Sequence, residues 1–368
     1  MCHTLCRACF QAGRTQSAGA TKRGRLLSNS VSGRGVYAAS YALSGFYSGR
    51  GKTWPVLWVN AATTVVNLVL DYALIFGRWG FPELGIRGAG IATVLAGVFS
   101  LLLFFALMCS AVNRNKFHTI KGWRLERDLF VRLLRYGFPS GVQFFLEMAG
   151  FTAFVLLVGR LGIASLAATN IAFNINTLAF MPMIGCGIAV SVLVGQYLGS
   201  DKPDRAQSAV YSGFHLTLAY MLSIAAAYVL VPDVFVAPFA LRADPEEFSE
   251  IYGYSIILLR FVAVYSVFDT MNIVFCSAIK GAGDTRYVML ITVILSVFIF
   301  ILPVYLAVVV FEFGLMVAWI FSSAYIISLG FIFYLRFLGG KWQTMRVIER
   351  REEVPMLKPT KLGRVAKL

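Results

Sequence analysis

Two carboxylates inside apolar stretches are the residues of this sequence most able to do chemistry. Glu147 lies near the middle of the apolar stretch from Tyr136 to Gly162, and Asp269 lies in another one from Ile251 to Ile279. An ionised carboxylate in the middle of a hydrocarbon layer costs at least about 2.5 kcal/mol, so such a residue has a partner, is neutral, or binds a cation. The two acids therefore predict proton or sodium chemistry.

The positions of the two acids place them at the same depth. Glu147 comes ten residues after its span starts at Gly137, and Asp269 comes ten residues before its span ends at Ile279, so each lies about 15 Å inside. Two ionised carboxylates repel each other, so one should hold a proton or both should share a cation. Tyr265, one helical turn before Asp269, could donate a hydrogen bond to a carboxylate or offer an oxygen to Na⁺. We predict a cation-coupling site made of Glu147, Asp269 and Tyr265, against the alternative of a merely hydrogen-bonded acid.

Other polar residues and prolines interrupt the apolar stretches. Asn170, Asn174 and Asn176 share one stretch, where they either line a substrate cavity or form hydrogen bonds between helices. Pro182 in the same stretch and Pro303 in a later one are candidates for helix bending.

The composition identifies the elements that must position these residues. Of 368 residues, 58% are hydrophobic and 14% charged, and the mean hydropathy is +0.73. Soluble domains are about 45–50% apolar and about 25% charged, so this composition is not that of a soluble domain. Apolar runs of about 20 residues are long enough to cross a membrane as helices. We expect eight such spans, Trp54–Phe76, Ile86–Cys109, Gly137–Leu161, Leu166–Tyr197, Tyr211–Phe239, Ile251–Ile279, Tyr287–Val310 and Gly314–Phe337.

The positive net charge of +15 follows the membrane topology and does not predict nucleic-acid binding. Lys and Arg gather in the short segments between spans, as cytoplasmic segments do. Counting spans places four basic segments inside, namely 113–135, 201–205, 280–286 and 341–367. The acidic segment 244–250 and Glu312 then fall on the opposite side, so the topology is self-consistent.

Enzymatic and metal-dependent functions are disfavoured. The three histidines, His3, His118 and His215, are scattered and do not pair with an acid or nucleophile at the spacing of a triad or metal site. Cys2, Cys6 and Cys9 cluster near the start, but no second ligand pair follows at zinc spacing. We predict a protein that is not an enzyme and that has no metal site beyond possible Na⁺ at Glu147 and Asp269.

A repeated loop divides the chain. Gly49-Arg-Gly-Lys-Thr53 recurs as Gly281-Ala-Gly-Asp-Thr285, each loop closing one span and opening a hairpin of two more. Repeated helical units are typical of transporters. Four expected spans lie between Asp128 and the second loop, whereas only a short apolar piece over residues 36–47 precedes the first. We therefore expect this sequence to be an N-terminally shortened or wrongly started reading of a twelve-span protein.

Several segments together carry a resemblance to a known family. They are Asn67-Leu-Val-Leu-Asp71, Pro82-Glu-Leu-Gly-Ile-Arg-Gly-Ala89, Met181-Pro-Met-Ile-Gly185, Val194-Gly-Gln-Tyr-Leu-Gly199 and Lys280-Gly-Ala-Gly-Asp-Thr-Arg286. In order and spacing the chain resembles the multidrug and toxic compound extrusion (MATE) transporters from about residue 41 to 340. In the NorM-like branch, helix seven carries a glutamate that Glu147 matches and helix ten an aspartate that Asp269 matches; Tyr265 fits as well.

The resemblance implies an all-α polytopic membrane protein with a two-lobe helical bundle. Residues 1–35 would be a non-family segment, 36–112 a partial N-terminal lobe with the end of helix four and helices five and six, and 113–135 a basic cytoplasmic linker. Residues 136–338 would form a complete six-helix C-terminal lobe, and 339–368 a basic cytoplasmic tail. The family's acid in helix one has no counterpart here.

The implied function is secondary antiport by alternating access. Amphipathic, often cationic organic compounds would leave the cell in exchange for Na⁺ or H⁺, through a monomer in the inner membrane that contacts lipid and binds no nucleic acid. Cofactors are not expected. The alternatives are a flippase for lipid-linked precursors, which would need a buried cluster of Arg or Lys, and an inactive truncated remnant.

Overall fold

The structure is a computed structural model that describes residues 35–110, 113–114, 126–240 and 245–345. This part of the chain is almost entirely helical, and no strand occurs in it. Eight of its helices are long and apolar enough to cross a membrane. The prediction of an all-α polytopic protein with eight spans is therefore confirmed.

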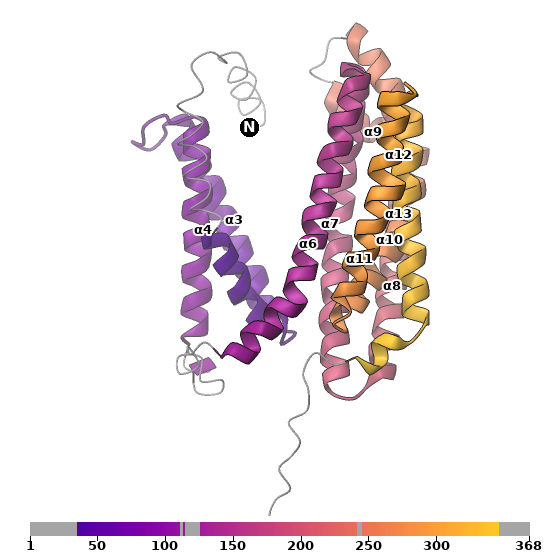
Figure 1. Ribbon diagram of the computed structural model, residues 1–368. Coiled ribbons are helices and arrows are strands. Elements are labelled where there is room, and N and C mark those ends of the chain that lie inside the picture. The colour runs from indigo at the N-terminus through magenta and orange to yellow at the C-terminus, as the bar shows by residue number, and fades with distance from the viewer. Residues whose placement is uncertain (1–34, 111–112, 115–125, 241–244, 346–368) are drawn as a thin grey trace, which may run out of the picture. The chain divides into compact units, whose positions relative to one another are not determined.

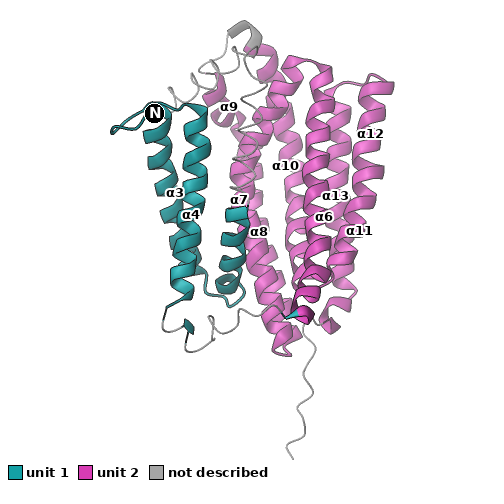
Figure 2. Cartoon of the chain, turned by 60° about the vertical axis from the view of Figure 1, so that its left-hand side comes forward, with its two compact units in different colours: residues 1–126 teal, residues 127–368 magenta. Residues whose placement is uncertain are grey.

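Three predictions concern residues outside the described ranges. The N-terminal cluster of Cys2, Cys6 and Cys9 with His3 lies there, as do most of the basic linker and most of the basic tail. The chain divides into two compact units, Met1–Glu126 and Arg127–Leu368 (Figure 2).

Unit 1 is a small helical unit. It contains a helix over residues 35–48, α3 (Thr53–Phe76) and α4 (Ile86–Met108), with α3 and α4 packed along each other. Its described core is a cluster of three buried side chains, Tyr47, Val59 and Phe104.

Unit 2 is a bundle of long helices (Figure 1). Its elements are α6 (Arg127–Val158), the 3₁₀ turn η1 (Gly159–Leu161), α7 (Ile163–Gly199), α8 (Pro203–Leu230), α9 (Pro232–Ala240), α10 (Pro245–Gly281), α11 (Thr285–Leu295), the π-helix η2 (Ser296–Ile301), α12 (Leu302–Tyr305), the π-helix η3 (Leu306–Val310), α13 (Leu315–Leu338) and the 3₁₀ turn η4 (Lys341–Thr344). One large apolar core runs through the bundle.

Helix α10 is the central element of unit 2, since it packs against α7, α8 and α13. Glycines let its neighbours approach closely. A Cβ on Gly330 of α13 would lie 2.7 Å from the carbonyl oxygen of Phe268, and one on Gly187 of α7 would lie 2.8 Å from Oγ of Ser277. Small residues at helix contacts are typical of membrane bundles, where packing must replace the hydrophobic effect.

The start of the span that contains Glu147 differs from the prediction. We expected it at Gly137, but α6 begins at Arg127, so the end of the predicted linker is helical and Pro139 lies in the helix interior. Proline removes one backbone N–H donor there. The hydroxyl of Ser140 donates to the carbonyl oxygen of Tyr136 at 3.2 Å and so satisfies one acceptor beside this site.

The predicted span Tyr211–Phe239 is wrong in its bounds. Helix α8 runs from Pro203 to Leu230, and the separate short helix α9 follows. The break falls at Val231, whose φ and ψ are −134° and 53°. The following residue, Pro232, explains it, because a proline disfavours helical geometry in the residue before it.

The two candidate bending prolines differ in their surroundings. Helix α7 continues as one α-helix through Pro182, whose bending role stays a prediction. Pro303 lies in the single turn α12, between the π-helices η2 and η3. π-Helical turns are a recognised cause of helix irregularity, and bending at Pro303 stays a prediction.

The repeated loops have the same backbone structure. In the first, the amides of Gly51 and Lys52 donate to the carbonyls of Ser48 and Tyr47; in the second, those of Gly283 and Asp284 donate to the carbonyls at the matching positions, Lys280 and Ile279. Both glycines have positive φ, 71° and 97°. This pair of hydrogen bonds around a left-handed glycine is the Schellman helix stop.

Gly283→Ala should lower the stability of the purified protein by about 1 kcal/mol, because an L-residue with a side chain is strained at a left-handed φ. The measurement is the thermal unfolding midpoint in detergent. Gly253→Ala is the matched control, since a Cβ at this helical position in α10 meets no atom within 4 Å. Equal midpoints for the Gly283→Ala protein and the parent would contradict the assignment.

Candidate functional site

Glu147 lies on α6 and has a direct partner on the same helix. The side-chain amide of Gln143, one turn earlier, donates from Nε2 to Glu147 Oε1 at 2.8 Å. Glu147 is half-buried, whereas Gln143 is 3% exposed. The other amide atom, Gln143 Oε1, is buried and accepts no hydrogen bond from the described residues.

Asp269 is buried in the middle of α10. It is 5% exposed, and Asn272 Nδ2 donates to Asp269 Oδ1 at 2.8 Å, one turn further along the helix. The amide therefore satisfies one oxygen of the carboxylate in the same way that Gln143 does for Glu147.

The structure brings the two predicted acids into one polar cluster inside unit 2. Gln143 Nε2 lies 3.8 Å from Cys276 Sγ, which joins α6 to α10. Glu147 and Asp269 are close enough to interact electrostatically, and both also act on Tyr325 of α13. The Tyr325 hydroxyl is 2.9 Å from Ser296 Oγ. We name these side chains the acid cluster: Gln143, Glu147, Asp269, Asn272, Cys276, Ser296 and Tyr325.

Tyr265 lies at the edge of the acid cluster. It is 3% exposed and interacts electrostatically with Asp269, but its hydroxyl is hydrogen-bonded to Asn176, whose Nδ2 donates at 3.2 Å. Since the hydroxyl accepts from this amide, its own proton is free to be donated elsewhere. The position fits the predicted supporting role, which stays a prediction.

The three asparagines of α7 separate into two groups. Asn176 reaches the acid cluster through Tyr265. Asn170 and Asn174 lie on the exposed side of α7, where Asn174 Nδ2 donates to the backbone oxygen of Asn170 at 2.8 Å. Asn176 thus forms a hydrogen bond between α7 and α10. Cavity lining stays a prediction for all three asparagines.

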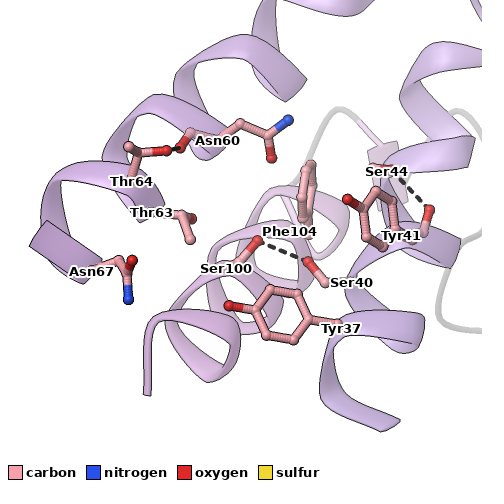
Figure 3. A pocket seen from close by; sticks show the side chains of 10 residues that line it. All are labelled: Tyr37, Ser40, Tyr41, Ser44, Asn60, Thr63, Thr64, Asn67, Ser100 and Phe104. Carbon is pink, nitrogen blue, oxygen red and sulfur yellow. Dashed lines mark hydrogen bonds between the residues drawn. The ribbon is translucent and has the colours of Figure 1, made fainter. Parts of the chain in front are cut away.

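Unit 1 contains a polar pocket that we did not predict (Figure 3). Its volume is about 260 Å³, and its walls carry hydroxyl, amide and aromatic groups. Three helices line it: the first helix contributes Tyr37, Ser40, Tyr41 and Ser44, α3 contributes Asn60, Thr63, Thr64 and Asn67, and α4 contributes Ser100 and Phe104. Ser40 Oγ and Ser100 Oγ are hydrogen-bonded at 2.8 Å across it.

An acid that the sequence reasoning passed over lies one turn beyond this pocket. Asp71 Oδ1 and Asn67 Nδ2, both in α3, are buried atoms without hydrogen-bond partners among the described residues. The signal was available, because an acid inside an apolar span is a functional candidate by default. We had used Asn67 and Asp71 only as part of the family resemblance.

The donor groups around the acids suit a hard monovalent cation or a proton. In the described ranges, no group of three or more His, Cys, Asp or Glu side chains could hold a metal ion. Carboxylate, hydroxyl and amide oxygens are the ligands that hard cations take. The residues present thus fit Na⁺ or H⁺ at Glu147 and Asp269, and binding of either ion there stays a prediction.

Eight membrane-length helices with two acids in one polar cluster, Asp269 buried and Glu147 half-buried, are typical of a polytopic membrane transport protein. The family follows from the comparisons. The MatE family model matches residues 139–306. A probable multidrug resistance protein NorM of Thermotoga maritima is 30% identical over 331 residues, which cover 87% of this chain and 67% of that protein. The chain belongs to the MATE family, whose members are transporters, so the predictions of the family and of a protein that is not an enzyme are confirmed.

Further relatives support the same fold. The multidrug resistance protein NorM of Burkholderia vietnamiensis is 32% identical over 241 residues, which cover 65% of this chain and 51% of that protein. The chain thus spans about two thirds of the first relative and half of the second. An outward-facing multidrug resistance MATE transporter superimposes with a TM-score of 0.76 at 19% identity, covering 89% of this chain and 72% of that one. The eukaryotic MATE transporter AtDTX14 superimposes with a TM-score of 0.76 at 19% sequence identity, and the match covers 87% of this chain and 69% of that one.

Proposed function

We propose that the protein is a secondary antiporter that exports amphipathic, often cationic organic compounds in exchange for Na⁺ or H⁺. The observation that carries the proposal is that the half-buried Glu147 and the buried Asp269 lie in one polar cluster of a MATE-family bundle. The named relatives are multidrug resistance proteins, which supports an organic substrate.

The mechanism follows from the repulsion between two nearby carboxylates. Without a cation, Glu147 and Asp269 destabilise each other; among the described residues, Gln143 donates a hydrogen bond to Glu147 and Asn272 donates one to Asp269. A bound Na⁺ or H⁺ removes the repulsion. The ion therefore shifts the bundle toward the conformation that holds it, and alternating access uses this shift to release the organic compound.

The remaining parts of the proposal concern the surroundings. We propose that the protein is a monomer of the plasma membrane that contacts lipid and binds no nucleic acid. Its linker and C-terminal tail lie in the cytoplasm, and its domain bounds are those expected from the sequence. Glu147, Asp269 and Tyr265 form the coupling site of unit 2. The substrate cavity is lined by Asn170, Asn174 and Asn176. These assignments rest on the distribution of charge along the chain and on the contacts given above.

Cells that express the chain, or a longer reading frame that contains it, should export ethidium or norfloxacin faster than cells with an empty vector. The measurement is the loss of intracellular fluorescence after loading. Repeating it at fixed pH with and without external Na⁺ assigns the coupling ion, since only a sodium-coupled protein needs Na⁺. Export at the empty-vector rate in every frame would contradict the function and favour an inactive remnant.

A further inference from the structure

Lys280 is the cationic side chain nearest to the acid cluster on α10, and its helix directs it toward that cluster. It lies at the end of α10, one turn after Cys276, and is partly buried. Side chains on a helix lean toward its N-terminus and cover the turn before their own residue. From this position the four-carbon stem of Lys280 can extend along the turn of Cys276.

Gln143, which contacts Cys276, carries an unused hydrogen-bond acceptor. Cys276 contacts Gln143, and Gln143 donates to Glu147, so two steps connect the turn of Lys280 with the carboxylate. Gln143 Oε1 is buried and has no donor among the described residues. Burial without a donor is unfavourable for an amide oxygen, and an ammonium group would supply the missing hydrogen bond.

Lys280 is a basic residue whose charge acts on the acid cluster. Lys280 interacts electrostatically with both Glu147 and Cys276. Arg336 of α13 is already engaged, because its guanidinium binds Asp284 at 2.6 Å and lies over the ring of Tyr287. In the described ranges no ion pair within 4 Å holds Lys280.

The internal repeat shows that this lysine is not required by the helix stop. The residue in the same place of the first loop is Ser48, and its carbonyl accepts the same turn hydrogen bond as the carbonyl of Lys280. A side chain without charge therefore supports the same backbone. The ammonium group occurs in the loop beside the Glu147 and Asp269 pair.

We propose that Lys280 is a tethered counter-cation of Glu147, whose ammonium group moves onto Gln143 Oε1 and the Glu147 carboxylate when the coupling ion leaves. This inference rests on the proposed function in taking Glu147 as the site of ion exchange. Two carboxylates and one ammonium leave a single negative charge, so one monovalent cation neutralises the cluster. Lys280 competes with that cation and favours its release at the end of α10.

The test is the reactivity of Glu147 toward dicyclohexylcarbodiimide, an apolar reagent that modifies protonated carboxyl groups. The purified chain in lipid nanodiscs is labelled at pH 7, and the modified peptide is quantified by mass spectrometry. Lys280→Met keeps the length of the side chain but removes its charge, so the protonated fraction and the labelling rate of Glu147 should rise about tenfold. Lys280→Arg keeps the charge and should label at the parental rate.

Two results would overturn the proposal. One is equal labelling of the Lys280→Met protein and the parent; the other is an Arg variant that labels as fast as the Met variant. Lys280→Gln gives a second neutral variant with the same expectation if the Met variant does not purify as a monodisperse protein, and Glu147→Gln verifies the labelled site. Because labelling needs no transport, a chain that exports no drug would contradict the proposed function and leave this result standing.

Discussion

Replacing Glu147 by Gln, or Asp269 by Asn, should lower drug export at least about fivefold, because coupling free energies between two ligands are typically about 1–3 kcal/mol. Each change keeps the size of the side chain and removes its charge. The variants also lose the repulsion within the pair, so the cluster no longer distinguishes its states with and without a cation. Export is measured as ethidium efflux at equal levels of protein in the membrane.

The matched control for these variants is Asp204→Asn. Asp204 is an exposed acid in the first turn of α8, and the change should leave export at the parental rate. If Glu147→Gln and Asp269→Asn export as well as the parent, the two acids do not couple the ion. The double variant should export no more slowly than the slower of the two single variants, since the two residues act as one site.

Trp319→Ala should destabilise unit 2 by about 3 kcal/mol, the largest effect on stability that we expect from one substitution. Trp319 of α13 is fully buried. Its ring stacks on Phe173 at 5.1 Å, and its Nε1 donates to Thr169 Oγ1 at 3.3 Å. The Ala variant leaves a large cavity between Phe173 of α7 and the backbone of α13. It also removes the N–H group that donates to the buried hydroxyl of Thr169.

The measurement is the thermal unfolding midpoint of the purified protein in detergent. Trp319→Phe should retain most of the stability, because it keeps an aromatic ring and loses one hydrogen bond worth about 1 kcal/mol. Ile320→Ala is the control, since the neighbouring side chain is 51% exposed. If the Trp319→Ala protein is as stable as the Ile320→Ala protein, the packing of Trp319 against α7 does not stabilise the bundle.

The helices were predictable because a membrane imposes length and apolarity together. All eight expected spans are present among the described residues, since each carries enough apolar residues to cross the layer. Their bounds were less accurate where the polar end of a helix extends beyond the membrane. Helix α6 starts at Arg127, well before the expected Gly137, because a charged amphipathic segment can be helical without being apolar.

The candidate site could be predicted only in part. The depth argument predicted Glu147 and Asp269 at one level because the rise per residue is fixed in a helix, and both lie in the acid cluster. It counted from Gly137, whereas α6 begins at Arg127, so the depth of Glu147 stays a prediction. It could not find Gln143, since a glutamine one turn from an acid is an ordinary residue until the acceptor and the facing helix are known. Asp71 was missed for a different reason, namely that we treated its span as a motif and not as a place for a charge.

The two Schellman helix stops share their backbone structure but differ in the charge of their side chains. The loops beginning at Gly49 and Gly281 keep the same backbone hydrogen bonds and the same left-handed glycine, although Lys52 corresponds to Asp284 and Ser48 to Lys280. The end of a helix is fixed by backbone geometry, whereas charge is free to change with chemistry. The same helix stop therefore accommodates different charges in the two loops.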